Sequence, residues 1–553
     1  MEALNAGNGM SDLHHSGWQG RSLSMGRFGT VSARGMRIAF LVGSAFVSVG
    51  VALQVVDIVK ARSTGYRLAG MGMSTEMIVG MCFIGAGIAV ALLALLRQPR
   101  GRQVDIHLVR REEERLTSAH WKLLSVLVFG LVIDTMKPLT LGFVIPGMRD
   151  EYGLSVSTAA QFPLVALAGT AIGSLLFGHL ADRVGRLPTI QLAVLIFIAT
   201  SICGAMPGFY YNVATCGFMG LSAGGMLPIV FSLISEVAPQ RRRTLLTVGV
   251  GALGGIGGYV AASNAAALII PHSSWRFLWL IGLPTGLILL VFARAIPESP
   301  RYLLQQGRAD EAKATLARFG VTDIVEAPGA PPEGRIRDIF SGEYARRTIS
   351  LSAYAALWGF TTFGLIIWLP TELRDAHVAS ADGVLAQASL LAVPGALACV
   401  FLYNMWSTKG SLVFFGLLTS LTLAGFAVWS TVQGHGGWYL SILAVMLLLA
   451  TTAINAGLMP YAAEVYPTRV RSTAVGVVAG AGKLGGVAGP IVTAVALPNA
   501  DGFGKIAAGV AVGMLAISAI VAWVAVETRG KPLEVTTGET DGLVAAEAVA
   551  LAE

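Results

Sequence analysis

Apolar stretches of roughly 18 or more residues recur along the whole chain and are separated by short polar loops. A stretch of this length crosses a hydrocarbon core as one helix, whereas a strand of a membrane β-barrel would alternate in polarity over about ten residues. The chain is 54% hydrophobic and only 13% charged. We therefore predict an all-α polytopic membrane protein surrounded by the lipid bilayer. The expected spans lie near residues 38–58, 74–96, 121–146, 158–181, 189–206, 210–235, 245–270, 275–296, 348–371, 384–406, 411–430, 438–460, 473–496 and 504–526.

The expected spans fall into three groups: one pair and two sets of six. Two six-helix halves joined by a polar loop are typical of duplicated transporters, whose substrate site lies near the bilayer midplane. In that loop, the stretch from Arg301 to Gly320 has the apolar spacing of one amphipathic helix. The expected segments are a disordered cytoplasmic tail at 1–35, a transmembrane hairpin at 36–97, a charged and partly helical cytoplasmic linker at 98–120, an N-terminal bundle at 121–296, a cytoplasmic loop at 297–347, a C-terminal bundle at 348–527 and a cytoplasmic tail at 528–553.

The excess of basic residues (+7) is a signal of membrane orientation. Arginines gather in alternate loops, near 183–186, 241–243, 301–347 and 469–471, whereas the loops near 207 and 435 have almost none. By the positive-inside rule the basic loops are cytoplasmic, so both termini are expected in the cytoplasm. The expected location is the inner or plasma membrane of the cell. The loop at 59–73 carries three basic residues and departs from this pattern. We expect no nucleic-acid partner.

Asp134 and Lys137 are a charged pair within the apolar segment from Trp121 to Pro146. Each charge at such a depth costs about 2.5–3.5 kcal/mol on insertion scales, so an ionisable residue there is a functional hypothesis by default. Three positions apart, the two share one helix face. Either they neutralise each other and only orient the helix, or they form a site that couples protons to substrate.

The sequence contains no cluster of metal ligands, no nucleophile triad and no nucleotide-binding loop. Its four cysteines fall inside expected spans, so no disulfide framework is indicated. Lys483 lies in a glycine-rich span, but Leu484 follows it where a phosphate-binding loop needs Ser or Thr. We predict a protein that is not an enzyme, needs no cofactor or metal, and drives transport from ion or solute gradients.

Four motifs at the ends of the expected spans resemble those of the major facilitator superfamily. They are GHLADRVGR (178–186), PESPRYL (297–303), EVYPTRVRS (464–472) and ETRGKPLE (527–534), and the last three are similar to the branch of sugar porters and metabolite:proton symporters. The resemblance covers about residues 120–535. It implies two six-helix bundles, here with an extra N-terminal hairpin, and a cytoplasmic latch of acidic and basic residues between the halves in the outward-open state. The gate residues implied are Gly178, Asp182, Arg183, Gly185, Arg186, Glu236, Glu298, Arg301, Glu464 and Arg469.

The fourth and seventh spans of the main body depart from the family. An arginine that often pairs with a first-span aspartate in relatives is Cys216 here, while Asp134 occupies the aspartate position. Lys137 could supply the missing cation. The seventh span carries aromatic residues, Trp358 and Phe363 among them, in place of the paired glutamines of hexose porters. Aromatic faces suit flatter, more apolar ligands than sugars, although helix packing explains any single one equally well.

A lysine in each half, Lys137 and Lys483, could face a shared cavity and favour a carboxylate substrate; alternatively Lys483 snorkels to an interface. The expected cavity residues are Gln161, Cys216, Tyr354, Trp358, Phe363, Asn455 and Lys483, with Asp134 and Lys137 for proton coupling. We predict a monomeric, proton-coupled importer of a small organic acid, a class that includes aromatic acids. The alternatives are a sugar or polyol:proton symporter, an antiporter or effluxer, and a nutrient sensor whose hairpin holds a signalling partner.

Overall fold

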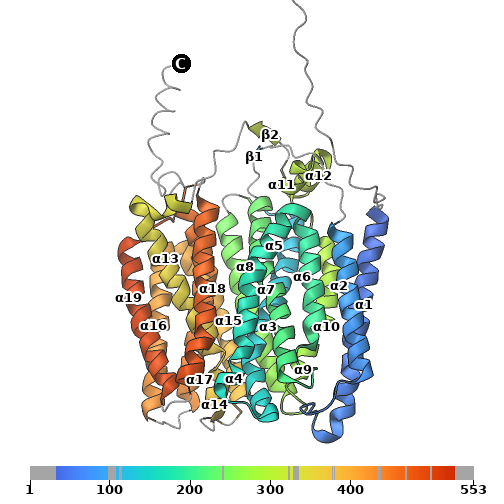
Figure 1. Ribbon diagram of the computed structural model, residues 1–553. Helices are drawn as coiled ribbons and strands as arrows, with labels where there is room; N and C mark the ends of the chain where they lie inside the picture. The colour runs from blue at the N-terminus through green and yellow to red at the C-terminus, as the bar shows by residue number, and fades with distance from the viewer. Residues whose placement is uncertain are drawn as a thin grey trace, which may run out of the picture.

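The computed structural model describes residues 33–96, 107–110, 115–239, 242–321, 324–327, 336–375, 378, 380–432, 437–467, 470–497 and 501–529. The predicted tails fall outside these residues except at their inner edges. Thirteen helices in the described chain are long and apolar enough to cross a bilayer. The span expected near 189–206 corresponds to a shorter apolar helix, Arg186–Ile202. The prediction of an all-helical polytopic fold is therefore confirmed, and the long helices run side by side (Figure 1).

The two halves follow an N-terminal hairpin in chain order. The hairpin is α1 (Ala33–Lys60), η1 (Ala61–Thr64) and α2 (Thr75–Leu96). The first half comprises α3 (Ser118–Tyr152), α4 (Val156–Ala159), α5 (Gln161–Val184), α6 (Arg186–Ala199), η2 (Thr200–Ile202), α7 (Phe209–Val237), α8 (Arg243–Ile269), α9 (Phe277–Leu280), α10 (Gly282–Phe292) and η4 (Ala293–Ala295). The second comprises α13 (Gly342–Phe360), the π-helical turn η6 (Thr361–Ile366), α14 (Leu369–Asp375), α15 (Ala381–Met405), α16 (Thr408–Val432), α17 (Gly437–Glu464), α18 (Arg471–Ala496) and α19 (Gly502–Val524).

The polar segments between these blocks differ from the prediction in two places. The expected amphipathic helix is two helices, α11 (Pro300–Gln305) and α12 (Ala309–Arg318), because Gly307 between them adopts a left-handed φ of 70°. The charged linker, expected to be partly helical, contributes strand β1 (His107–Arg110), which pairs antiparallel with β2 (Ile324–Ala327) of the central loop. A strand of four residues gains its hydrogen bonds only from a distant partner, so local sequence does not reveal it. A short 3₁₀ turn, η5 (Ile336–Phe340), leads into α13.

Glycines allow the hairpin helices to pack backbone to backbone. A Cβ added at Gly43 of α1 would lie 2.6 Å from the carbonyl oxygen of Gly87 in α2, and one added at Gly50 would lie 2.5 Å from that of Gly80. Small residues at such contacts are the usual means by which membrane helices associate. The hairpin stands at the edge of the first half, where it packs against α6 (Figure 1).

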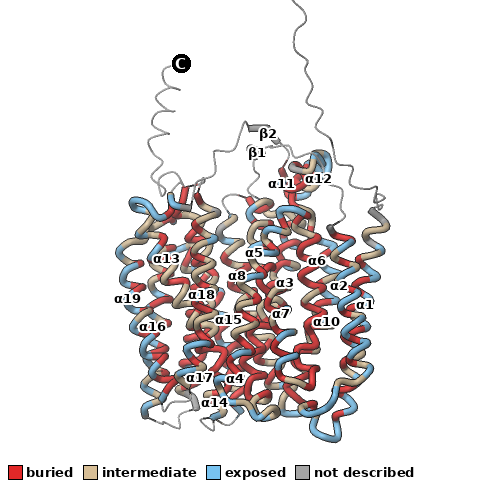
Figure 2. The backbone as a smooth tube through the Cα atoms, in the orientation of Figure 1, coloured by how far each residue is buried: buried red, intermediate tan, exposed pale blue. Residues whose placement is uncertain are grey.

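The hydrophobic core lies between the helices, and exposed apolar residues lie on their outer faces (Figure 2). Outer residues such as Leu421 and Trp523 are at least 70% exposed, which is expected where lipid rather than water surrounds the protein. The two halves meet through α8 with α15 and α17, through α5 with α18, and through α3 with α14. These contacts leave space for a central cavity.

The bundle has two ends, a basic-loop face and an opposite face. The basic-loop face is the end at which α5, α7 and α17 end and α6, α8 and α18 begin; α11, α12 and the β1–β2 pair lie on it (Figure 1). The opposite face carries α4, α9 and α14. On the opposite face the halves are in tight contact, because a Cβ added at Gly142 of α3 would lie 2.5 Å from the carbonyl oxygen of Ile367. Arg149 and Asp375 also form an inter-half ion pair of 3.4 Å there.

Candidate functional site

A cavity of about 2090 Å³ lies between the two halves. Its wall includes Asp134 of α3, Lys483 of α18 and Trp358 of α13 at depth, and Arg243 and Arg301 at the basic-loop face. The cavity therefore extends from the middle of the bundle toward the basic-loop face, while the opposite face is closed by the contacts between α3 and the segment before α14.

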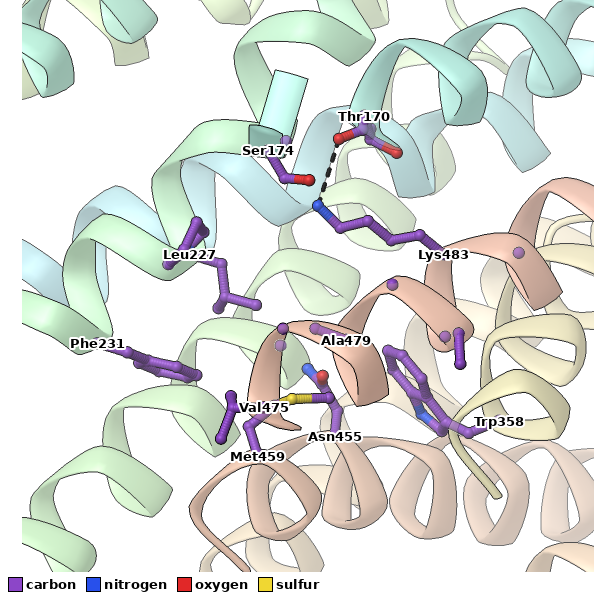
Figure 3. Close-up of a pocket in the computed structure, with 18 of the residues that line it drawn as sticks. Thr170, Ser174, Leu227, Phe231, Trp358, Asn455, Met459, Val475, Ala479 and Lys483 are labelled. Atoms are coloured by element: carbon purple, nitrogen blue, oxygen red, sulfur yellow. Dashed lines mark hydrogen bonds between the residues drawn. The ribbon is translucent and has the colours of Figure 1, made fainter. Parts of the chain in front are cut away.

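Lys483 and Asp134 bring opposite charges to this cavity from different halves. The side chain of Lys483 crosses from α18 toward α5, where its Nζ donates to the carbonyl oxygen of Thr170 at 3.3 Å (Figure 3). The ammonium and the carboxylate of Asp134 interact electrostatically without a direct ion pair between them. In the described part of the chain, Asp134 has no hydrogen-bond partner of its own. The ammonium group of Lys483 is therefore held in place without a direct contact to a carboxylate, and its charge remains available to attract an anion.

The aromatic wall beside Lys483 is fixed by close packing of α13 and η6 against α18. A Cβ at Gly359 would lie 2.0 Å from the carbonyl oxygen of Gly482, so the two backbones touch. The indole Nε1 of Trp358 donates to the carbonyl oxygen of Thr451 at 2.8 Å, which orients its ring. Phe363 stands edge-on to Trp358, with ring centroids 6.4 Å apart. Both rings line the cavity next to the helix that carries Lys483.

The wall next to these rings is irregular in its backbone. Residues Thr361–Ile366 form π-helical turns in the middle of the seventh span of the main body. Such turns are rare and occur frequently at functional sites, because they displace side chains from their regular helical positions. Here the turn contributes Thr362, Phe363 and Ile366 to the cavity wall.

Of the residues expected for proton coupling and for the substrate cavity, five line the cavity: Asp134, Trp358, Phe363, Asn455 and Lys483. Asn455 faces Gly255 of α8, since a Cβ there would lie 3.6 Å from the Asn455 amide nitrogen. Figure 3 places Asn455, Trp358 and Lys483 around one space. Their roles in transport stay predictions.

Lys137 does not take the place expected for it. Its side chain is buried among α3, α6 and η2, where Nζ donates to the Phe197 carbonyl oxygen and, at 3.2 Å, to Thr200 Oγ1. It also stands 3.9 Å from the centroid of the Phe197 ring. The position three residues beyond Asp134 turns the long side chain into the first half, so Lys137 is not the cation that Asp134 faces.

Three further residues expected in the cavity lie elsewhere. Gln161 is exposed at the start of α5, toward the opposite face. Cys216 is fully buried within the first half, beside Cys203. Tyr354 is fully buried in the second half, and its hydroxyl donates to the Leu412 carbonyl oxygen at 2.7 Å. Each points away from the cavity because its helix turns that position toward its own bundle or toward the protein surface.

Hydroxyl groups of the cavity were missed by sequence reasoning. Thr170 and Ser174 lie one helical turn apart on the cavity side of α5, and Tyr259 and Thr362 lie on α8 and η6. The spacing of Thr170 and Ser174 was a usable signal, because it marks one polar stripe on an apolar helix. Tyr259 and Thr362 carried no comparable signal.

Five of the expected gate residues form a network near the end of the first half: Asp182, Gly185, Arg186, Glu236 and Glu298. Arg186 pairs with Asp182 at 2.9 Å and with Glu236 at 3.2 Å, and its backbone N–H donates to Glu298 Oε1 at 2.7 Å. Gly185 has a φ of 103°, which favours glycine, and a Cβ there would meet the Glu298 carboxylate at 2.5 Å. Burial raises the pKa of the Glu298 carboxyl, against the effect of the backbone amides that donate to it.

Among the ion pairs between described residues, none joins an expected gate residue of one half to the other half on the basic-loop face. Arg183 is exposed, and the helix around Gly178 has open space beside it. Arg301 and Glu464 line the mouth of the cavity instead, and the Glu464 carboxylate accepts from Thr528 Oγ1 at 2.6 Å. Arg469 lies outside the described residues. Among ion pairs of the described chain, Arg149–Asp375 on the opposite face is the one that joins the halves.

The cavity lies between two six-helix halves and is open at one face and closed at the other. In a comparison with protein families, residues 123–490 match the model of the Major Facilitator Superfamily. The chain belongs to this superfamily. It is therefore a multi-pass secondary transporter of the membrane rather than an enzyme, and the recognition from its motifs is confirmed.

Members of the superfamily with similar sequences or structures include two bacterial transporters and one solved symporter. The niacin transporter NiaP of Acinetobacter baylyi is 28% identical over 435 residues, which are 75% of this chain and 96% of that protein. The 4-hydroxybenzoate transporter PcaK of Pseudomonas aeruginosa is 29% identical over 399 residues, 68% of this chain and 85% of that protein. The partially occluded, inward-open structure of the xylose transporter XylE from E. coli aligns with a TM-score of 0.62 at 16% identity, over 75% of this chain and all of that one. The last similarity supports the fold alone.

Proposed function

We propose that this superfamily member imports a small aromatic carboxylate together with protons, by alternating access across the cell membrane. The observation that carries the proposal is the pairing of Lys483 with Asp134 across a cavity whose adjoining wall is formed by Trp358 and Phe363. The basic-loop face is then cytoplasmic, so the conformation described here is inward-facing.

The substrate class follows from the chemistry of the wall. An ammonium group in a largely apolar cavity attracts an anion strongly, because little solvent screens it. Aromatic faces contribute contact area and a preferred geometry for a flat ring. A carboxylate on Lys483 with its ring against Trp358 and Phe363 satisfies both features. The names of the relatives support this choice, since niacin and 4-hydroxybenzoate are both ring compounds that carry a carboxyl group.

Proton coupling follows from the competition for Lys483. When Asp134 is ionised, its charge offsets that of Lys483 and lowers the attraction for a second carboxylate. When Asp134 takes up a proton, the ammonium is free to attract the substrate. Proton binding and substrate binding at such a pair strengthen each other by the same factor, as linkage requires. Each substrate anion then enters with at least one proton.

Alternating access requires the opposite face to open while the basic-loop face closes. The contact of Gly142 with Ile367 and the ion pair Arg149–Asp375 would separate in the outward-facing state. Arg186 and Glu236, now joined within the first half, would meet the loops of the second half. Asp134 and Lys483 would remain together at the pivot and be presented to each side in turn.

The proposal is tested by uptake into proteoliposomes under an imposed pH gradient. The panel holds nicotinate, benzoate, 4-hydroxybenzoate, succinate, xylose and a polyol, each with the wild type and with Lys483→Gln. Gradient-driven accumulation of an aromatic acid, lost or strongly weakened in Lys483→Gln, is the expected result. Accumulation of a sugar that survives Lys483→Gln would contradict the substrate class. Export of the substrate from the vesicles, driven by proton movement in the opposite direction, would contradict import as the direction of transport.

A further inference from the structure

Tyr259 of α8 brings to the cavity wall a hydroxyl group that no group in the described part of the chain bonds. Its side chain is 4% exposed, its ring stands edge-on to Phe143 at a centroid distance of 6.0 Å, and the residue lines the cavity. Within the described chain its buried hydroxyl has no hydrogen-bond partner. The same holds for the buried Oγ1 of Thr362 on η6, another residue of the wall.

Buried hydroxyls without partners are uncommon, because each has given up its hydrogen bonds to water without replacement. The buried Oγ of Ser352 on α13 also has no partner in the described chain, so the cavity wall holds three such hydroxyls, which need an explanation. The hydroxyl groups of Tyr259 and Thr362 are not needed for packing, since phenylalanine and valine would fill the same volumes without a polar atom. Several other hydroxyls of the wall are satisfied locally; Thr170, for example, donates to the Leu167 carbonyl oxygen at 2.7 Å. Tyr259 and Thr362 are therefore placed to bond a group that is not part of the protein.

The position of Tyr259 relative to Lys483 indicates which part of a ligand it would meet. Lys483 reaches the side of the cavity where α18 adjoins α5, whereas Tyr259 belongs to α8, which adjoins α15 and α17 on the other side. The aromatic wall of Trp358 and Phe363 lies on the helices that pack against α18. A flat acid whose carboxylate binds Lys483 thus extends its far edge across the cavity toward α8.

We infer that Tyr259, assisted by Thr362, hydrogen-bonds a second polar group on the substrate ring, remote from the carboxylate, and so selects hydroxylated or nitrogen-containing aromatic acids over unsubstituted ones. This inference rests on the proposed function. A site built to bond such a group discriminates against the analogue that lacks it, because its own polar atoms are then left unpaired. Without the hydroxyl of Tyr259, that discrimination falls.

The test uses purified full-length protein and competition binding with a radiolabelled aromatic acid. The competitors are benzoate, nicotinate, 3-hydroxybenzoate and 4-hydroxybenzoate. In the wild type we expect at least one polar-substituted acid to bind tighter than benzoate. Tyr259→Phe should weaken that acid by about 5- to 30-fold, as loss of one buried hydrogen bond predicts, while benzoate changes by less than about twofold. Thr362→Val should act in the same direction with a smaller effect.

Tyr354→Phe is the matched control, because it removes a tyrosine hydroxyl that is bonded to the Leu412 carbonyl oxygen away from the cavity. It should leave the ratio of the two acids unchanged even if it lowers stability. Equal weakening of benzoate and the substituted acid in Tyr259→Phe, or no change in either, would overturn the inference while leaving the proposed function intact. Failure of the wild type to bind any of the acids would overturn both.

Discussion

Asp134 and Lys483 face one cavity from opposite halves of the molecule, and their charges interact although no hydrogen bond joins them. Lys483 is held instead by the carbonyl oxygen of Thr170. A lysine anchored to the neighbouring half by a neutral acceptor keeps its charge available to a ligand. Under the proposed function, this relationship would link protonation of Asp134 in one half to anion binding by Lys483 in the other, as proton symport requires.

The first prediction concerns Asp134→Asn. The amide has the shape of the carboxyl group but cannot release a proton, so the variant should lose accumulation driven by a pH gradient. Because Lys483 is then permanently unopposed, substrate binding and exchange should survive. Uptake under a gradient and counterflow in preloaded proteoliposomes measure the two activities separately. Retained gradient-driven accumulation would contradict the role of Asp134.

The second prediction compares the two intramembrane lysines. Lys483→Gln should weaken acid binding by about 10-fold or more, because a charge-assisted contact is worth about 1.5–3 kcal/mol. Lys137→Met is the control. Its ammonium is buried against Phe197 and Thr200 outside the cavity, so the variant should bind the acid within about twofold of wild type. Titration of binding by isothermal calorimetry gives both values. Equal losses in the two variants would contradict the assignment.

The sequence predicted the architecture because hydropathy alone determines which segments cross a bilayer. It placed the hairpin and both halves, and even the unusually short α6 was expected as a span. It failed where structure depends on distant partners. Strand β1 pairs with β2 across about 200 residues of chain, and the break at Gly307 depends on a single left-handed residue.

The candidate site was predicted in its components but not in its pairing. Asp134 and Lys483 stood out as charges in apolar segments, and that signal was sufficient to find them. Their juxtaposition depends on the packing of α5 against α18, which no local pattern encodes. Lys137 was misplaced for the same reason: residues three apart on a helix are close, but their side chains leave the axis in directions about 60° apart. Tyr354 and Cys216 turn into their own bundles.

The third prediction concerns the buried ion pair of Arg276 and Glu151 beneath the hairpin loop. The two charges are 2.6 Å apart and almost completely buried, and Glu151 also accepts from the backbone N–H groups of Leu68 and Ala69. Glu151→Gln leaves the Arg276 charge uncompensated and should destabilise the protein by about 3–5 kcal/mol. Unfolding in denaturing detergent measures this.

The control for the buried pair is Glu311→Gln, which removes one partner of the exposed Arg308–Glu311 pair. Surface pairs contribute at most about 1 kcal/mol, so the midpoint of unfolding should barely move. If both variants are equally stable, Glu151 does not tie the hairpin loop to the end of α3 in the way the contacts indicate.

The fourth prediction concerns the closed opposite face. A Cβ at Gly142 would lie 2.5 Å from the Ile367 carbonyl oxygen, so Gly142→Ala forces the halves apart at that face and should favour the outward-open state by about tenfold or more. Pulsed electron paramagnetic resonance between spin labels at positions 155 and 380, in a background without native cysteines, measures the opening. Gly249→Ala, which has open space beside it, should leave the distance distribution unchanged. An unaltered distribution in Gly142→Ala would show that this contact does not hold the closed face.

The fifth prediction concerns pH and Glu298. Burial raises the pKa of this carboxyl above its ordinary 4.5, so the folded protein binds the proton more tightly than the unfolded chain does. The stabilisation is full below about pH 4.5 and is lost as the pH rises through the raised value. Glu298→Gln should therefore flatten the decline of the unfolding midpoint over that range, measured in detergent from roughly pH 4 to pH 8. A decline as steep in Glu298→Gln as in the wild type would assign the pH dependence to another group.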